Sequence, residues 1–167
     1  MRNRIISGII IVLMLLGAVC VAEEKTELAP YSLKNISDIQ EELDLYLADE
    51  DISIGGDDMR GQLYRSWSPG ITIQCTNAGN IVNLTVNAGG ERFTLFGITL
   101  GMREDEARSA LHDYCTQNTI PIGYEEWYDT SLYLEFEYDE NQPELDYGFL
   151  GLILDNGVVT EISQYYL

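Results

Sequence analysis

Basic side chains are scarce in this sequence, and their scarcity excludes several kinds of partner. Nine Lys and Arg residues stand against 28 Asp and Glu, which gives a formal net charge of −19. Nucleic acids and anionic membrane surfaces are bound by pairing phosphates with Lys and Arg, so we expect neither to be a partner. The acidity serves solubility alone, or it favours a protein or peptide of basic character.

Catalytic groups are almost as rare. The single histidine, His112, stands beside Asp113 in an apparent helix, where a solvated side chain is the first interpretation and a general base the second. The sequence holds no Gly-x-Ser-x-Gly motif, and its Gly-Gly pair at residues 55–56 is followed by two aspartates, which would repel a phosphate. The sequence therefore predicts neither an enzyme nor a bound cofactor.

Metal ligands form one partial pattern. Asp49, Asp51 and Ser53 have the spacing of the first three ligands of an EF-hand loop. The pattern then fails, because Ile54 stands where the loop needs Gly and Arg60 where it needs a bidentate Glu. We expect a solvated loop here, with a calcium site as the alternative, and no metal site elsewhere.

The three cysteines include one pair that bears on the fold. Cys20 lies in an apolar N-terminal run, which leaves Cys75 and Cys115 as an even pair, and a disulfide between them would persist if the chain is exported. Both also stand at positions where buried apolar residues are expected. The pair is therefore either a bridge or two small hydrophobic residues that face one another.

The amino terminus has the order of a secretory leader. Arg2 and Arg4 precede an apolar run over residues 5–21, and Ala22 is a small residue that suits cleavage. Residues 1–22 are thus a signal peptide or, uncleaved, a membrane anchor, and lipid attachment at Cys20 is a further alternative. We expect a secreted or extracytoplasmic protein that meets the membrane only through this segment, with a net charge near −21 once it is removed.

The remaining residues, 23–167, read as a single domain of two repeats, 31–96 and 97–167. An offset of 68 residues aligns two apolar stripes at helical spacing, in which Ile39, Leu43, Tyr46 and Leu47 match Ala107, Leu111, Tyr114 and Cys115. The fold class predicted is α+β, with two tandem helix-plus-antiparallel-sheet repeats that share one sheet and pack their helices on one face. We expect helices over 37–48 and from 104 to before Pro121, and a loop over 49–59, with a short strand at Ile52 and Ile54 as the alternative at its start. Strands are expected over 71–76, 82–86, 93–96, 132–138, 149–154 and 158–165.

Two short motifs resemble a known family. Gly97-Ile98-Thr99-Leu100-Gly101-Met102 precedes an acidic helix start, and Asn156-Gly157-Val158-Val159 follows later in the chain. Together they resemble the modules of the SmpA/OmlA (outer-membrane assembly lipoprotein) group, and the tandem arrangement is similar to the β-lactamase inhibitor protein fold. The resemblance implies a non-enzymatic envelope or secreted protein that grips another protein with an open sheet face.

The candidate binding surface is the sheet face opposite the helices. Strand alternation puts acidic groups and rigid aromatic rings on this face, namely Tyr133, Glu135, Glu137, Glu161 and Tyr165, with Trp127 and Tyr128 on the adjoining loop. The alternative is an ordinary solvated sheet face.

We expect a secreted or envelope-tethered binding protein for a basic protein or peptide. An envelope structural or assembly lipoprotein-like module is the alternative, and a carboxylate-dependent hydrolase the third.

Overall fold

The computed structural model describes residues 25–31, 33–54, 59–137 and 147–165. The leader predicted over residues 1–22, with Cys20, lies outside the described residues. Within these ranges, no helix is both long enough and apolar enough to cross a membrane. The elements are β1 (Thr26–Glu27), the 3-10 helix η1 (Ala29–Tyr31), α2 (Ile36–Ile39), β2 (Leu45–Ser53), β3 (Arg60–Ser66), β4 (Ile71–Thr76), β5 (Ile81–Val86), β6 (Phe93–Thr94), α3 (Glu104–Asn118), β7 (Ile122–Tyr128), β8 (Ser131–Phe136), β9 (Phe149–Asp155) and β10 (Val158–Tyr165).

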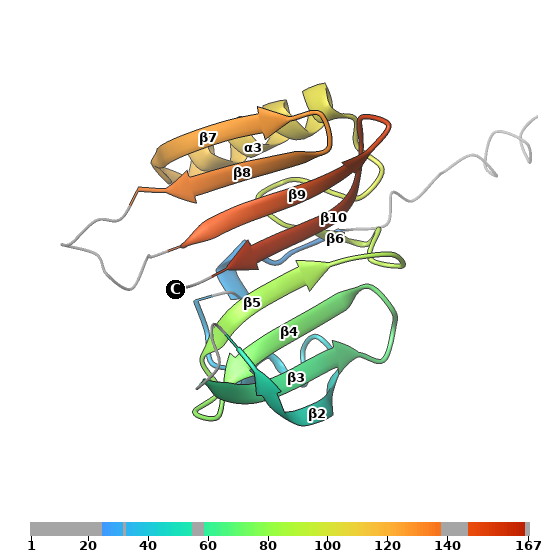
Figure 1. Ribbon diagram of the computed structural model, residues 1–167, viewed down its shortest axis with the longest axis vertical. Coiled ribbons are helices and arrows are strands. Elements are labelled where there is room, and N and C mark those ends of the chain that lie inside the picture. Colours follow the sequence, from blue (N-terminus) through green and yellow to red (C-terminus); the bar gives the residue numbers. More distant parts are fainter. Residues whose placement is uncertain (1–24, 32, 55–58, 138–146, 166–167) are drawn as a thin grey trace, which may run out of the picture.

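One large antiparallel sheet dominates the protein. Its eight strands lie in the order β2-β3-β4-β5-β10-β9-β8-β7, so that β2 and β7 form the two edges. Figure 1 shows α3 behind β7 and β8, while the front of the sheet has no helix over it. A separate pair, β1 and β6, runs parallel. The sheet therefore has one face that packs into the core and one face open to solvent.

The predicted fold class is wrong. The helix expected over 37–48 is a single turn, α2, and the chain is already in strand β2 from Leu45 onward. The protein is mostly sheet, not a tandem pair of helix-plus-sheet repeats with helices packed on one face. Of the eight strands, β2 to β5 come from residues 31–96 and β7 to β10 from residues 97–167. The loop predicted over 49–59 is wrong through Ser53, which belongs to β2.

Local geometry explains the short helix. Ile39 and Leu43 are buried, as helical spacing requires, but Leu47 leaves 37% of its surface exposed. Between them Asp44 takes a left-handed conformation with φ 53°, which a helix does not continue through. Leu45 is buried as the first residue of β2, so pairing with β3 takes over where the helix was expected.

Several other predicted elements are confirmed. α3 spans Glu104–Asn118, and Glu106 Oε2 accepts a hydrogen bond from the Arg103 N–H at 2.9 Å, which caps its first turn. The β4–β5 and β9–β10 hairpins occur where alternation and turn residues predicted them. The strand expected over 93–96 is shorter, because only Phe93–Thr94 is extended, and it pairs with β1 outside the large sheet.

The core lies between the sheet, α3 and residues 28–43, and Phe96 is among its largest fully buried residues. Its ring is fully buried and lies 4.5 Å from the ring of Phe136, 5.6 Å from that of Tyr147 and 5.8 Å from that of Tyr114. Phe96 has φ 54°, a conformation that a bulky residue adopts only when its surroundings enforce it. The packing of these rings therefore offsets local backbone strain.

Glu27 holds this strained segment in place. Its Oε1 accepts hydrogen bonds from the N–H of Ala29 at 3.0 Å and of Phe96 at 2.8 Å. Its Oε2 accepts from the Thr94 hydroxyl at 2.8 Å and from the Gly97 N–H at 2.9 Å. One carboxylate thus joins the amino-terminal strand β1 to residues about 70 positions away in the sequence.

The two described cysteines, Cys75 and Cys115, are buried free thiols, so no disulfide joins them. The Cys75 thiol donates a hydrogen bond to the Gln62 carbonyl at 3.7 Å. Burial raises the pKa of Cys75 and raises that of Cys115 to about 11. Both thiols therefore stay protonated at neutral pH.

Candidate functional site

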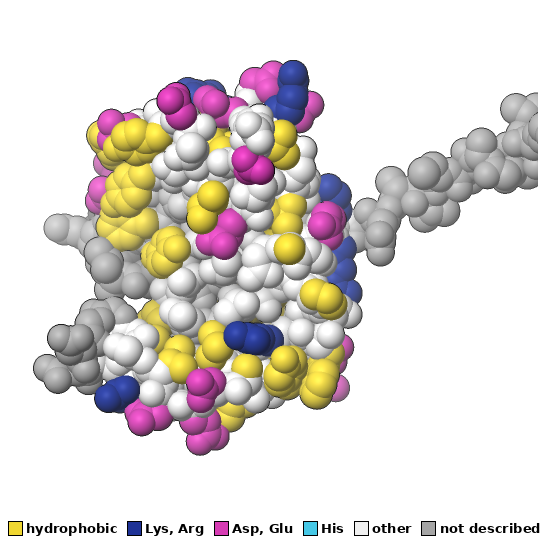
Figure 2. Space-filling model, turned by 45° about the vertical axis from the view of Figure 1, so that its right-hand side comes forward, with side chains coloured by type: hydrophobic (Ala, Val, Ile, Leu, Met, Phe, Trp, Pro, Cys, Tyr) yellow, Lys and Arg dark blue, Asp and Glu magenta, His cyan; other side chains and the backbone are white. Residues whose placement is uncertain are grey.

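The open half of the sheet formed by β7, β8, β9 and β10 carries a continuous aromatic and acidic surface. In register, Tyr133 lies between Glu126 on β7 and Gly151 on β9. Figure 2 shows hydrophobic and acidic side chains together over the upper part of the molecule, where these strands lie. We call this surface the acidic aromatic face, and its residues are Tyr124, Glu126, Tyr128, Tyr133, Glu135, Phe149, Ile153, Glu161 and Tyr165.

The aromatic rings of this face are in contact and partly exposed. Tyr133 stacks on Phe149 with ring centroids 5.6 Å apart, and the Tyr124 ring lies 6.3 Å from that of Tyr133. The Tyr165 ring lies beside Gly151, where a Cβ atom would be in ordinary van der Waals contact with it at 3.6 Å. Tyr124, Tyr128, Tyr133 and Tyr165 each keep more than 40% of their surface exposed. The rings hold one another in position and still present area to a partner.

Glu126 is the carboxylate on the open side of the edge strand β7. Tyr124 Oη donates a hydrogen bond to Glu126 Oε2 at 2.6 Å, and Tyr128 donates to the same carboxylate. These two hydrogen bonds lower the pKa of Glu126, and the same bonds raise the pKa of Tyr124 and Tyr128. The carboxylate is therefore kept ionised and held in place between two exposed rings.

The structure brings four of the seven predicted site residues onto this face from the strands where alternation put them. Tyr133 and Glu135 lie on β8, and Glu161 and Tyr165 lie on β10. Tyr128 also lies on the face, although it belongs to strand β7 and not to a loop. Glu137 is exposed just beyond β8, where its N–H donates to the Pro121 carbonyl at 2.9 Å.

Trp127 is the site residue that the sequence misplaced. It lies in β7 with its side chain on the helix side, where the Arg108 guanidinium stands 4.4 Å from the ring centroid and Glu125 accepts the indole N–H. Glu125 Oε2 also pairs with His112 Nε2 at 2.9 Å. His112 is therefore a half-exposed side chain on α3 that contacts Glu125, and Trp127 anchors β7 to the helix.

Sequence reasoning missed four residues of the face, namely Tyr124, Glu126, Phe149 and Ile153. The β7 pair was hidden because residues 122–128 hold two adjacent glutamates and no simple alternation of apolar and polar residues. A signal for Phe149 and Ile153 was present, since both alternate with the buried Leu150, Leu152 and Leu154 of β9.

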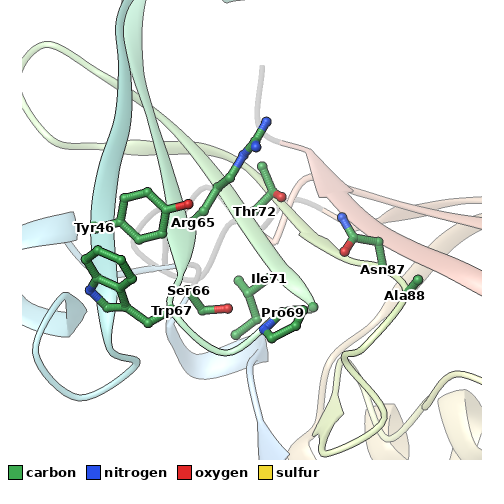
Figure 3. Close-up of a pocket in the computed structure, with 10 residues that line it drawn as sticks. Tyr46, Arg65, Ser66, Trp67, Pro69, Ile71, Thr72, Asn87 and Ala88 are labelled. Atoms are coloured by element: carbon green, nitrogen blue, oxygen red, sulfur yellow. The ribbon is translucent and has the colours of Figure 1, made fainter.

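A second feature, a surface hollow of about 390 Å³, lies at the other end of the open face. Figure 3 shows Tyr46 and Trp67 on one side of it and Thr72 and Asn87 on the other. The two rings lie 4.3 Å apart, and Trp67 is 68% exposed. Arg65 stands at the rim and forms no ion pair with any residue that the structure describes. The open face therefore carries a basic side chain, Arg65, at the end away from β7.

The described ranges hold no group of three or more His, Cys, Asp or Glu side chains placed to bind a metal ion. Asp49, Asp51 and Ser53, the partial calcium pattern, lie in β2. Asp51 instead pairs with Arg60 at 3.6 Å across to β3.

The chain matches no protein-family model, and comparisons with curated proteins and with solved structures find no similar protein. The resemblance to the SmpA/OmlA group and to the β-lactamase inhibitor protein fold stays a prediction. Function therefore has to be inferred from the geometry of this chain.

Proposed function

We propose that this chain is a non-enzymatic binding protein, secreted or tethered to the cell envelope, that recognises a protein or peptide of basic character. The acidic aromatic face is the surface that binds. The observation that carries this proposal is the unbroken set of exposed rings and carboxylates across β7, β8, β9 and β10. Export rests on the order of charged, apolar and small residues in the predicted leader.

The aromatic part of the face suits a protein partner. Exposed Tyr side chains supply contact area at low cost in conformational entropy, and Tyr is enriched where binding energy concentrates. Scattered exposed apolar residues are ordinary, whereas a contiguous patch on a soluble protein marks an interaction surface. Tyr124, Tyr133 and Phe149 touch in sequence across three strands, so they form such a patch.

The charge of the face selects the partner. Glu126, Glu135 and Glu161 lie among the rings, and the face contains no Lys or Arg. In a chain of formal charge −19, the surrounding field also attracts cations and repels anions. Carboxylates at the rim of such a patch steer the approach of a basic partner and raise its association rate.

The size of the face limits the partner's footprint. Neighbouring strands lie about 4.8 Å apart, and successive residues on the same face of a strand lie about 6.7 Å apart. Three such residues on each of four strands therefore cover an area of about 400 Å². A typical stable interface buries about 800 Å² on each partner. The face alone therefore fits an extended peptide segment or the centre of a larger interface.

The test is affinity capture by the purified protein from its own source, with paired baits. The first pair is the unchanged protein and Tyr133→Ala, and the second is Glu135→Gln and Glu41→Gln. The last two make the same change of charge, but Glu41 is exposed outside the face. A captured protein of basic character, retained less by the Tyr133→Ala bait and released by salt, is the expected result.

The strength of each effect follows from its physical role. Tyr133→Ala should speed dissociation, with a loss of about 1 to 3 kcal/mol in binding if the ring is an anchor. Glu135→Gln should mainly slow association and flatten its dependence on salt, while Glu41→Gln changes neither. Equal retention by the unchanged protein and by the Tyr133→Ala and Glu135→Gln baits would place the binding surface elsewhere.

A further inference from the structure

The outer edge of the sheet at β7 has main-chain groups with no strand to pair with. Tyr128 pairs with Ser131 across a two-residue turn, which makes this the hydrogen-bonded pair that closes the hairpin. By alternation Glu126 is also hydrogen-bonded to β8, so the main-chain N–H and C=O of Glu125 and Trp127 point outward. Among the described residues, no main-chain hydrogen bond reaches these outward groups.

This edge is more regular than the opposite one. After a register shift between Ile122 and Tyr124, β7 runs without interruption to Tyr128. The β2 edge has two register shifts and a left-handed residue, Asp51, with φ 62°. Bulges of this kind blunt an edge against pairing, whereas a straight edge accepts another strand.

The two sides of β7 differ in chemistry. On the open side, Glu126 stands between Tyr124 and Tyr128. On the helix side, Glu125 already pairs with His112, and the Arg108 guanidinium covers the Trp127 ring. A strand placed beside β7 would therefore meet the Glu126 carboxylate on one side and the Arg108 and His112 side chains on the other.

An apolar hollow lies beside this edge on the helix side. It has a volume of about 520 Å³ and is lined by residues of α3 and by the chain entering β7, including His112, Thr116, Ile120, Pro121 and Ile122. Apolar side chains of a neighbouring strand would point toward this hollow, because successive residues alternate between the two sides.

We propose that the partner contributes an extended segment of alternating basic and apolar residues, which joins the sheet as a further strand along β7. Its basic side chains lie over Glu126 and the adjoining tyrosines, and its apolar side chains lie toward the hollow between α3 and β7. The outward groups of Glu125 and Trp127 hydrogen-bond to its main chain. This inference rests on the proposed function and adds the way in which the partner binds.

A second copy of this chain is a poor occupant for the same edge. Antiparallel pairing of two β7 strands centred on Glu126 would place the two Glu126 side chains directly opposite one another. Like charges opposite one another destabilise a strand pair. The net charge of −19 on each copy adds long-range repulsion, so charge favours a basic segment over self-association.

The probes are two capped eight-residue peptides of the same composition. In the first, Lys and Val alternate, and in the second, four Lys precede four Val. Binding to the purified protein is measured by isothermal titration calorimetry at low and at physiological salt. The alternating peptide is expected to bind at least about tenfold more tightly, because only its pattern matches the two sides of β7.

A pair of variants separates main-chain pairing from charge. Glu125→Pro and Glu125→Gln both remove the same carboxylate charge, but only proline removes the outward N–H. Far-UV circular dichroism checks that both variants fold. Glu125→Pro is expected to bind the alternating peptide about tenfold more weakly than Glu125→Gln. In the unchanged protein, saturation with this peptide should slow amide hydrogen exchange at Glu125 and Trp127 by at least about tenfold.

The outcomes distinguish the two proposals. Equal affinity for both peptides, lost on Glu135→Gln, would leave basic recognition by the face standing and overturn strand addition. Equal affinity of Glu125→Pro and Glu125→Gln, or unchanged exchange at Glu125 and Trp127 in the saturated complex, would also overturn strand addition. The absence of binding by either peptide at millimolar concentration would count against both proposals.

Discussion

Replacing Glu27 by Gln tests the packing that positions the sheet. The carboxylate accepts four hydrogen bonds, two at each oxygen, from Ala29, Thr94, Phe96 and Gly97. Glutamine keeps one oxygen and replaces the other with an NH₂ group, which cannot accept. With the NH₂ group toward Ala29 and Phe96, two N–H donors would face another donor. With it toward Thr94 and Gly97, the Thr94 hydroxyl can turn to accept from the NH₂ group, and the Gly97 N–H alone would face a donor.

The expected loss follows from the one or two hydrogen bonds that the amide cannot accept and from the lost charge. Hydrogen bonds to a charged group contribute about 1.5 to 3 kcal/mol each, and a buried donor left without an acceptor costs about 1 to 3 kcal/mol. Because Glu27 is only partly buried, water replaces some of what is lost. We expect Glu27→Gln to lower the free energy of unfolding by about 2 to 4 kcal/mol, measured by urea denaturation followed by circular dichroism.

The control is Glu91→Gln, which makes the same change at an exposed side chain a few residues from the same segment. This variant should change the free energy of unfolding by less than about 0.5 kcal/mol. A loss below about 1 kcal/mol for Glu27→Gln, with an unchanged denaturant slope, would refute the role given to this carboxylate in holding Phe96 and Gly97.

Three further predictions concern single groups. Because burial raises the pKa of the Cys115 thiol to about 11, its neutral form should stabilise the fold fully below about pH 9 and lose that contribution as the pH approaches 11. Unfolding at pH 8 and pH 10.5 should therefore show a larger loss of stability for the unchanged protein than for Cys115→Ala, and equal losses would contradict this. Since Asp44 has φ 53°, Asp44→Gly should be nearly neutral in thermal unfolding, whereas Asp44→Val should cost about 1 to 2 kcal/mol. Replacing Tyr124 and Tyr128 by Phe should raise the pKa of Glu126 toward its ordinary value, as read by carboxyl NMR titration, and an unchanged pKa would rule out the two hydrogen bonds.

The elements that the sequence predicted well are those in which local pattern and packing agree. α3 has an apolar stripe, an acidic first turn and a buried face through Ala107, Leu111 and Cys115. The β9–β10 hairpin joins two apolar alternations through Asn156-Gly157, where both residues have positive φ and suit a tight turn. In these segments the neighbours in sequence are enough to specify the structure.

The elements that the sequence did not predict depend on distant partners. Asp49, Glu50 and Asp51 are poor strand formers, yet they lie in β2 because β3 pairs with them. A helix at the same place would need Leu47 to be buried, and the sheet leaves it partly exposed. The four apolar residues at helical spacing therefore did not form a helix, because this segment pairs with β3 as a strand. Apolar and polar residues do not alternate along it, so the sequence alone did not predict the strand.

The candidate site was also predicted only where the local sequence pattern was enough. Alternation in β8 and β10 was enough to put Tyr133 and Tyr165 on one surface. The edge strand β7 was read as a loop, so Glu126 with its two tyrosine donors was missed and Trp127 was given the wrong surroundings. A pattern of paired glutamates between aromatic residues carries no periodicity that separates the two faces of a strand.

The most direct measurement of the central claim is amide chemical-shift mapping by NMR, on titrating the isotope-labelled protein with the partner captured from its own source. If the acidic aromatic face binds, the largest shifts will occur at Glu126, Tyr133, Gly151 and Tyr165, and they will diminish as salt is added. Shifts confined to the hollow beside Trp67, with those four amides unchanged, would contradict the claim.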